Sequence, residues 1–191
     1  MAKTHVVVII PPEPIEHELE DLMLKLNSRY HASKALLHKP HVTLKSLGII
    51  SDKRFIEAGG EIGEATWYVE PFPLEMEGLR FYGSNENFPG VYIPVQKSSQ
   101  LLDLHTRLAT NLKPFCDKKD RSYKEFENYN PHLTLVGNDI SPEDLERAKR
   151  ELKNVNYSYS FPVDRIVFVR HTEGRASLSP NWELMIGLGR S

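Results

Sequence analysis

The sequence predicts an α+β fold, and two observations carry this prediction. Short segments with the alternation typical of strands are interleaved with longer segments whose apolar residues recur at helical spacing. The pentapeptide at residues 40–44 (PHVTL) also recurs, with one aliphatic exchange, at residues 131–135 (PHLTL), 91 residues further along the chain. Two copies of so specific a pattern indicate an internal duplication or one chemistry used twice, so we expect two similar halves.

The first half begins with an apolar strand and an amphipathic helix. The strand over residues 5–10 is closed by the two prolines that follow it. The helix over residues 13–30 has acidic residues near its start and Lys25 and Arg29 near its end, which is the polarity that the helix dipole favours. A strand over residues 41–47 then carries the first pentapeptide.

A second helix and two further strands complete this half. Ser51 can cap a helix over residues 51–65, although two adjacent glycines weaken it. Strands over residues 72–82 and 91–95 are separated by turn residues, which predicts a hairpin with a long loop.

The second half repeats the order of helix, motif strand, helix and two strands. A polar loop at residues 115–130 precedes its motif strand, and Pro142 suits the first turn of its second helix. The expected elements are a helix from residue 98 or 99 to Pro114, a strand over 132–136, a helix over 141–152, and strands over 157–169 and 177–188.

Composition limits the classes of function. The chain has 191 residues, of which 40% are hydrophobic and 26% charged, which fits a single domain over residues 1–191. A formal net charge of −2 argues against strong binding to long nucleic acid, whereas a nucleotide end needs only a local pocket. The single Cys116 and the brevity of the apolar run at residues 6–10 favour a cytoplasmic protein without a membrane segment, and we expect a monomer.

The repeated motif predicts a catalytic cleft. In a strand, residues two apart lie on one face about 6.5 Å from each other, so each copy offers an imidazole and a hydroxyl to the same side. Histidine can take or give a proton at neutral pH, and threonine hydroxyls can bind phosphate oxygens. The sequence His31-Ala32-Ser33 has the same spacing but lies in a helical stretch, so we set it aside.

The paired motifs resemble those of the 2H phosphoesterase superfamily, in particular its branch of 2′-5′ RNA ligases and cyclic phosphodiesterases. The resemblance implies a bilobed, pseudo-twofold fold, with two antiparallel sheets flanking a central cleft and helices outside. It implies a cofactor-free enzyme that opens 2′,3′-cyclic phosphates, at an RNA terminus or in a small cyclic nucleotide, to a 2′-phosphate. By family habit His41 gives the proton and His132 takes one, while Thr43 and Thr134 hold the phosphate.

Three further residues are candidates for contacts with phosphate or base. Lys39 adjoins the first motif, and Arg170 ends an apolar strand. Tyr129 belongs to a loop in which aromatic and charged residues alternate, a composition that can stack a nucleobase. The other members of this loop that we considered are Tyr123, Phe126, Lys118, Lys119, Arg121 and Lys124.

Several alternatives remain open at this stage. The same cleft could serve an RNA ligase, or it could hold a phosphorylated RNA end without turnover. A metal-dependent hydrolase would need a site such as His38 with His41 and His132, but no carboxylate stands at ligand spacing, and we predict no metal.

Overall fold

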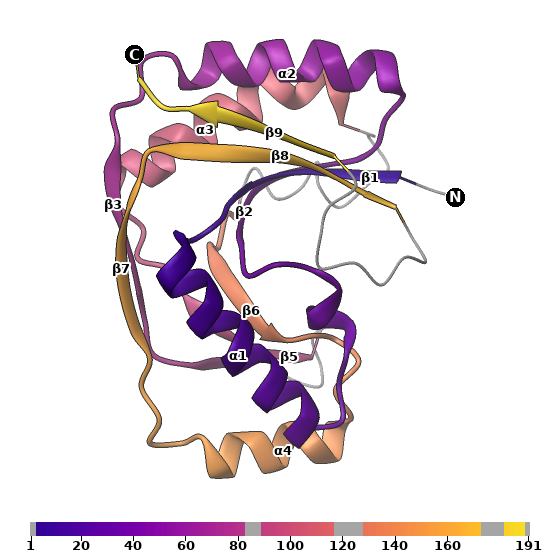
Figure 1. Ribbon diagram of the computed structural model, residues 1–191, viewed down its shortest axis with the longest axis vertical. Helices are drawn as coiled ribbons and strands as arrows, with labels where there is room; N and C mark the ends of the chain where they lie inside the picture. Colours follow the sequence, from indigo (N-terminus) through magenta and orange to yellow (C-terminus); the bar gives the residue numbers. More distant parts are fainter. Residues whose placement is uncertain (1–2, 83–88, 117–127, 173–181, 190–191) are drawn as a thin grey trace.

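The computed structural model describes residues 3–82, 89–116, 128–172 and 182–189, and it has the expected α+β class with two antiparallel sheets (Figure 1). The strands are β1 (Lys3–Ile9), β2 (Val42–Ile49), β3 (Phe72–Glu77), β4 (Arg80–Tyr82), β5 (Gly90–Pro94), β6 (His132–Val136), β7 (Ser158–Val163), β8 (Arg165–Thr172) and β9 (Trp182–Gly187). The α-helices are α1 (Glu13–Arg29), α2 (Asp52–Thr66), α3 (Ser99–Leu112) and α4 (Pro142–Glu151), and two short 3-10 helices cover Lys34–Leu37 and Lys113–Phe115.

The two sheets differ in size. Seven strands form one sheet in the order β4-β5-β6-β2-β1-β8-β9, while β3 and β7 form a two-stranded ribbon. The motif strands β2 and β6 are neighbours at the centre of the large sheet, where Val42 pairs with Leu133. The large sheet therefore brings the two motifs together.

Two predicted strands are each divided into two. The segment over residues 72–82 is interrupted at Gly78, whose φ of +85° is a conformation that favours glycine. Its first part, β3, pairs with β7, and only its second part, β4, forms the hairpin with β5. The segment over residues 157–169 is likewise divided at Asp164. Of the last predicted strand, residues 177–181 lie outside the described residues.

Serine caps begin three of the four helices, as the sequence predicts for α2 and α4 and allows for α3. The hydroxyls of Ser51, Ser98 and Ser141 each accept a hydrogen bond from the backbone N–H three residues later. The two adjacent glycines do not break α2, and a Cβ at Gly59 would lie only 3.1 Å from Leu184 of β9. Among the described residues, no helix is long and apolar enough to cross a membrane.

The two repeats of the chain are interleaved in space. The first repeat runs from β1 to β4 and the second from β5 to β8, with β9 added at the end. However, α1 packs on β6 and β4 pairs with β5, whereas α3 packs on β2 and β8 pairs with β1. In Figure 1, α2 and α3 lie at one end of the molecule and α1 and α4 at the other. We call these ends the β2 lobe (β1, β2, β8, β9, α2, α3) and the β6 lobe (β4, β5, β6, α1, α4).

The faces of the large sheet have different roles. The main core lies between the sheet and the helices, and it includes one face of each motif strand. On the opposite face of the β2 lobe, a smaller cluster contains Val8, Val167 and Val169. Val8 pairs with Thr43 and also with Val167, so this second face is the one that carries the motif hydroxyl.

Candidate active site

The motif side chains gather on the face of the sheet away from the helices. Val42 and Leu133, the paired residues of β2 and β6, have no exposed surface and point into the main core. Because side chains alternate along a strand, their neighbours in sequence point to the other side. These neighbours are partly exposed and are the predicted residues His41, Thr43, His132 and Thr134.

The antiparallel pairing of β2 with β6 places the histidine of each motif near the threonine of the other. Because β2 and β6 run antiparallel through the Val42–Leu133 pair, His41 lies towards Thr134 and Thr43 towards His132. Each imidazole therefore has the hydroxyl of the other motif as its neighbour, and one small anion could contact all four groups.

Both imidazoles are held in the same tautomer. Nδ1 of His41 lies 2.8 Å from the carbonyl oxygen of Lys39, and Nδ1 of His132 lies 2.8 Å from that of Asn130. A carbonyl oxygen only accepts, so Nδ1 carries a proton in each ring and donates it. In both cases the acceptor is two residues earlier in the chain, and Nε2 is the nitrogen left for proton transfer.

Helices of the opposite repeat anchor the two motif strands. His105 of α3 hydrogen-bonds through Nδ1 to the carbonyl oxygen of Leu44 at 2.8 Å. Asn27 of α1 donates from its amide nitrogen to the carbonyl oxygen of Leu135 at 2.7 Å. Leu44 and Leu135 are the final residues of the two pentapeptides, so the anchoring has the same symmetry as the motifs. Asn27 is fully buried and His105 nearly so, which makes both bonds costly to lose.

Tyr129 adds a second contact to the first motif. Its hydroxyl donates to the carbonyl oxygen of Thr43 at 3.1 Å, and its ring stacks on His105 with centroids 3.7 Å apart. The strand β2 has an irregular register against β1 at this point, between the partners of Val7 and Val8. Tyr129 and His105 therefore bind two successive carbonyl groups where regular pairing is interrupted.

The surroundings of the two catalytic candidates lower the pKa of both imidazoles. Burial lowers the pKa of His41 to about 4, and the imidazoles of His38 and His132 add to this effect against the opposing influence of the Lys39 carbonyl. Burial also lowers the pKa of His132, which the Asn130 carbonyl partly offsets. Near pH 7 the His41 side chain of the unliganded protein is therefore neutral.

Different rings surround the two histidines. The His132 ring makes edge contacts with Tyr82 and Tyr92, whose own rings stack with centroids 4.3 Å apart. The Tyr82 hydroxyl lies 3.2 Å from Nδ1 and 3.4 Å from Nε2 of His132. On the His41 side the neighbour is His38, which in turn contacts His171. The two halves of the site are thus symmetric in their motifs and unlike in their surroundings.

Comparison with known proteins identifies the family. Residues 11–175 match the profile of the 2′-5′ RNA ligase superfamily, which is most of the chain. The chain belongs to this superfamily, whose members are 2H phosphoesterases. It is also 28% identical over 160 residues, 84% of both chains, to a protein of Halalkalibacterium halodurans named "Putative phosphoesterase BH1439".

Solved structures share the fold of this superfamily member. LigT of E. coli in its apo form superimposes with a TM-score of 0.60 at 13% identity, covering 98% of this chain and 99% of LigT. The protein TT0787 of Thermus thermophilus gives a TM-score of 0.58 at 14% identity, covering 97% and 94% of the two chains. At these identities the likeness establishes the fold and leaves the reaction to be argued from the site.

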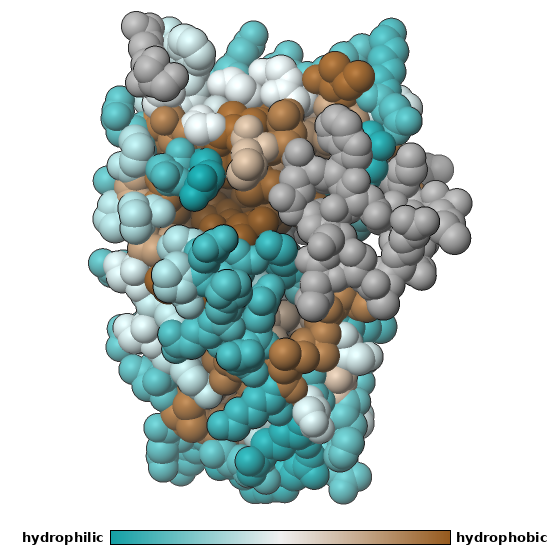
Figure 2. All heavy atoms as spheres, viewed as in Figure 1, coloured by the Kyte–Doolittle hydropathy of each residue, from teal (hydrophilic) through white to brown (hydrophobic). Residues whose placement is uncertain are grey.

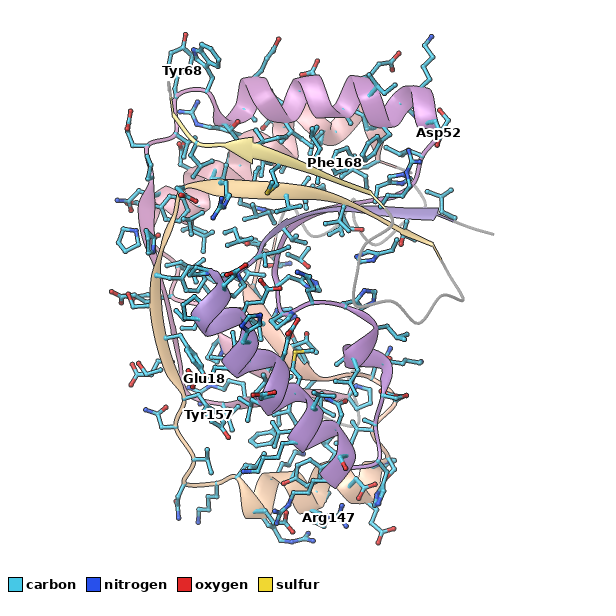
Figure 3. The ribbon with its side chains drawn as sticks, viewed as in Figure 1. Glu18, Asp52, Tyr68, Arg147, Tyr157 and Phe168 are labelled. Atoms are coloured by element: carbon cyan, nitrogen blue, oxygen red, sulfur yellow. The ribbon has the colours of Figure 1, made fainter. Side chains whose placement is uncertain are left out.

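The structure places Arg170 away from the face that carries the two motifs. Arg170 pairs with His5 across β8 and β1, on the face of the sheet that the helices cover. Its guanidinium lies 3.0 Å from Asp52 and 4.6 Å from the ring centroid of Phe55. Figure 3 shows Asp52 at the start of α2 and Phe168 on β8 beneath that helix. Arg170 therefore joins α2 to the sheet.

Lys39 and Tyr129 have other contacts than those predicted. The ammonium of Lys39 pairs with Glu16 of α1 at 2.8 Å, while its carbonyl orients His41. A contact between the Lys39 side chain and phosphate thus stays a prediction. Tyr129 stacks on His105 and donates its hydroxyl to β2, and a contact between its ring and a nucleobase stays a prediction.

The remaining sequence candidates fall into two groups. The loop residues Tyr123, Phe126, Lys118, Lys119, Arg121 and Lys124 lie outside the described residues. For the three-histidine set of His38, His41 and His132, the described residues contain no group of three histidine, cysteine or acidic side chains arranged to hold a metal ion.

Sequence reasoning did not find several residues that the structure places at the site. They come from segments far apart in the chain and carry no local motif, so only the tertiary arrangement identifies them. The symmetry of the two repeats would have been the one available signal, since it predicts equivalent anchors on the helix that precedes each motif. These residues are Asn27, Tyr82, Tyr92, His105 and His171.

A hollow adjoins the motif face in the β2 lobe. It has a volume of about 240 Å³ and is lined by apolar side chains of residues 9–12, β7, β8 and β9, with Lys39 also in its wall. Its charged lining residues are two basic and three acidic: Lys39, Arg165, Glu13, Glu16 and Asp164. Figure 2 shows apolar surface gathered where β1 and β8 run, above the hydrophilic surface of α1.

Proposed function

We propose that this superfamily member is a 2H phosphoesterase that opens 2′,3′-cyclic phosphates, at RNA ends or in cyclic nucleotides, to 2′-phosphates. The observation that carries the proposal is the matched tautomer of His41 and His132, each with Nδ1 bound to a carbonyl and Nε2 left for chemistry on one face. Thr43 and Thr134 on the same face can donate to the phosphate oxygens.

The reaction needs one base and one acid. The base accepts a proton from water through Nε2 as the water oxygen bonds to phosphorus. The bond from phosphorus to the 3′-oxygen breaks, and the acid gives its Nε2 proton to that oxygen, which leaves as the 3′-hydroxyl. The two threonine hydroxyls stabilise the negative charge that develops on the non-bridging oxygens. The products are a 2′-phosphate and the enzyme with the proton moved from one histidine to the other.

Within this mechanism we assign the base to His41 and the acid to His132, the reverse of the assignment that family habit implies. The protonated form is less favourable for His41 than for His132, because burial and the imidazoles of His38 and His132 lower the pKa of His41 to about 4. The pKa of His132 is also lowered, but its ring has tyrosine neighbours instead of further histidines. The neutral form suits the base and the more easily protonated ring suits the acid.

The hollow beside His41 supports a nucleoside as part of the substrate. Its basic and acidic lining charges nearly cancel, and its floor is apolar, so it suits a sugar or base better than a phosphate. LigT of E. coli, which has the same fold, has been crystallised with 3′-AMP. Both observations are consistent with a nucleotide whose phosphate reaches the histidines.

The test is turnover of 2′,3′-cyclic mononucleotides and short RNAs with cyclic-phosphate ends, in the presence of EDTA. The wild type is compared with His41→Ala and His132→Ala, each expected to lose about 10²-fold or more in kcat. The control is His31→Asn, because His31 is exposed, contacts Asp144 on the far side of the β6 lobe and has a φ of +52° that asparagine tolerates.

Each outcome separates the proposal from its rivals. Turnover that survives EDTA and is lost in both alanine variants supports the paired-histidine hydrolase. Turnover lost in EDTA and restored by a divalent ion would favour a metal-dependent enzyme instead. Tight binding of the cyclic phosphate without turnover would favour a non-catalytic binder of RNA ends. Joining of RNA ends in preference to hydrolysis would favour a 2′-5′ RNA ligase.

A further inference from the structure

Two histidines that the mechanism does not use extend the site beyond His41. The ring of His38, just after the 3-10 helix over Lys34–Leu37, lies edge-on to His41 with centroids 6.1 Å apart. His171 of β8 lies edge-on to His38 with centroids 4.4 Å apart. By strand alternation His171 shares the face of Val167 and Val169, which is the face of Thr43. The row His41, His38, His171 therefore leads away from the reacting phosphate along one surface.

Among the described residues, no acidic group is positioned to offset a positive charge on His38 or His171. Burial lowers the pKa of His171 to about 4 and also lowers that of His38, and His5 and His41 add to the effect at His171. Within the described part of the chain, no carboxylate is among the groups that shift either pKa.

The nearby charged side chains of neighbouring segments face elsewhere. Lys39 is paired with Glu16, and Arg170 with Asp52 on the opposite face of the sheet. Nδ1 of His38 is buried and has no hydrogen-bond partner among the described residues. This nitrogen can therefore form a hydrogen bond to a ligand without first losing one to the described residues.

We propose that His38 and His171 form a second phosphate-binding site, so that the preferred substrates carry another phosphate one nucleoside away from the cyclic one. This inference rests on the proposed function and deepens it, since it selects RNA ends and 5′-phosphorylated nucleotides over nucleoside cyclic phosphates. The two rings are neutral in the empty site and each takes up a proton when the dianionic phosphate arrives. The anion then offsets the repulsion between two neighbouring imidazolium rings.

The same chemistry explains how the second phosphate would fit the mechanism. A protonated His38 beside His41 raises the cost of a proton on His41. The bound phosphate dianion brings two negative charges with the two protons, so it offsets this repulsion and lets His41 still accept the proton from water.

The experiment compares two product-like ligands by titration calorimetry on the intact protein. Adenosine 2′-phosphate carries one phosphate and adenosine 2′,5′-bisphosphate carries two. At pH 6 we expect the bisphosphate to bind about tenfold more tightly, with net proton uptake measured from buffers of different ionisation enthalpy. Above pH 8 the advantage should fall to about twofold or less, because the free energy needed to protonate the rings grows with pH.

Matched glutamine variants complete the test. His38→Gln and His171→Gln keep a hydrogen-bonding side chain but cannot be protonated, and each should reduce the pH 6 advantage to about twofold. His17→Gln, at an exposed position of α1, should leave the advantage unchanged. Equal loss of affinity for both ligands in the two variants would overturn the proposal, as would an advantage independent of pH.

A metal site would give a different result. If zinc, and not the second phosphate, bound the row tightly in the wild type and not in His171→Gln, the proposal would also be overturned. Because these readouts are binding ratios, they do not depend on turnover. Failure of the proposed reaction would appear as no hydrolysis of cyclic phosphates, with the bisphosphate advantage still measurable.

Discussion

The proposed roles of the two histidines can be separated by changing the leaving group. A substrate whose 3′-oxygen is replaced by sulfur expels a thiolate, which leaves without needing a proton from the enzyme. A variant that lacks only the acid should therefore recover its activity with this substrate. A variant that lacks the base should not recover.

The structure gives the size of the effect that is at stake. At pH 7, three pH units above a pKa of about 4, only one His41 side chain in about a thousand carries a proton. If His41 were the acid, holding that proton in the free enzyme would cost about 4 kcal/mol, at about 1.36 kcal/mol per pH unit. When His41 serves as the base, the neutral form that the reaction requires is already the populated one at pH 7.

The assay measures kcat/KM for the oxygen and sulfur forms of one cyclic phosphate at pH 7. We expect His132→Ala to lose about 10²-fold or more with oxygen but less than about tenfold with sulfur. His41→Ala should lose a similar large factor with both. The reverse pattern would refute the assignment and restore the roles that family habit implies. Equal loss in both variants with both substrates would refute separate acid and base roles.

Three further predictions concern the groups that hold the site. Asn27→Ala removes the donor to the Leu135 carbonyl and should lower the free energy of unfolding by about 1–3 kcal/mol, measured by urea denaturation. Tyr129→Phe removes one hydrogen bond but keeps the ring on His105, so it should cost about 1 kcal/mol in the same assay. His171→Gln should make the protein less sensitive to acid, because unfolding raises the pKa of this ring from about 4 to its ordinary 6.5. The unfolded chain then binds more protons between these values, so stability falls as pH falls through this window.

These stability predictions have internal controls. Asn111→Ala removes a longer bond of 3.3 Å from a partly buried asparagine to the Glu61 carbonyl, so its effect should be smaller than that of Asn27→Ala. His17→Gln should leave the acid sensitivity as it is in the wild type. Equal effects of the two asparagine variants would contradict the anchoring role, and unchanged acid sensitivity in His171→Gln would contradict the buried, neutral state of that ring.

The sequence predicts the parts of this fold that depend on local chemistry. Helix starts at Ser51 and Ser141 follow from capping, and the shared face of His41 and Thr43 follows from strand alternation. The repeated pentapeptide predicts two equivalent strands, although it gives no information on which elements pair with them.

The remaining features depend on contacts that are distant in sequence. Arg170 follows four residues of β8 that are buried on both faces, so the pattern of hydrophobic residues does not reveal which face of the sheet its side chain joins. The residues around Tyr129 have the composition of a loop, yet the Tyr129 ring packs against the core. His38 and His171 are 133 residues apart, and only the pairing of β8 with β1 brings them together.

The interleaving of the two repeats has a consequence for how the chain folds. The outer edge of β1 is covered only when residues 165–172 are available, and α1 needs β6 as its packing surface. During synthesis the first repeat therefore emerges with an unpaired strand edge and an uncovered apolar helix face. We expect late, slow folding governed by these long-range pairings, and a fragment that ends before β5 should aggregate instead of forming half of a working site.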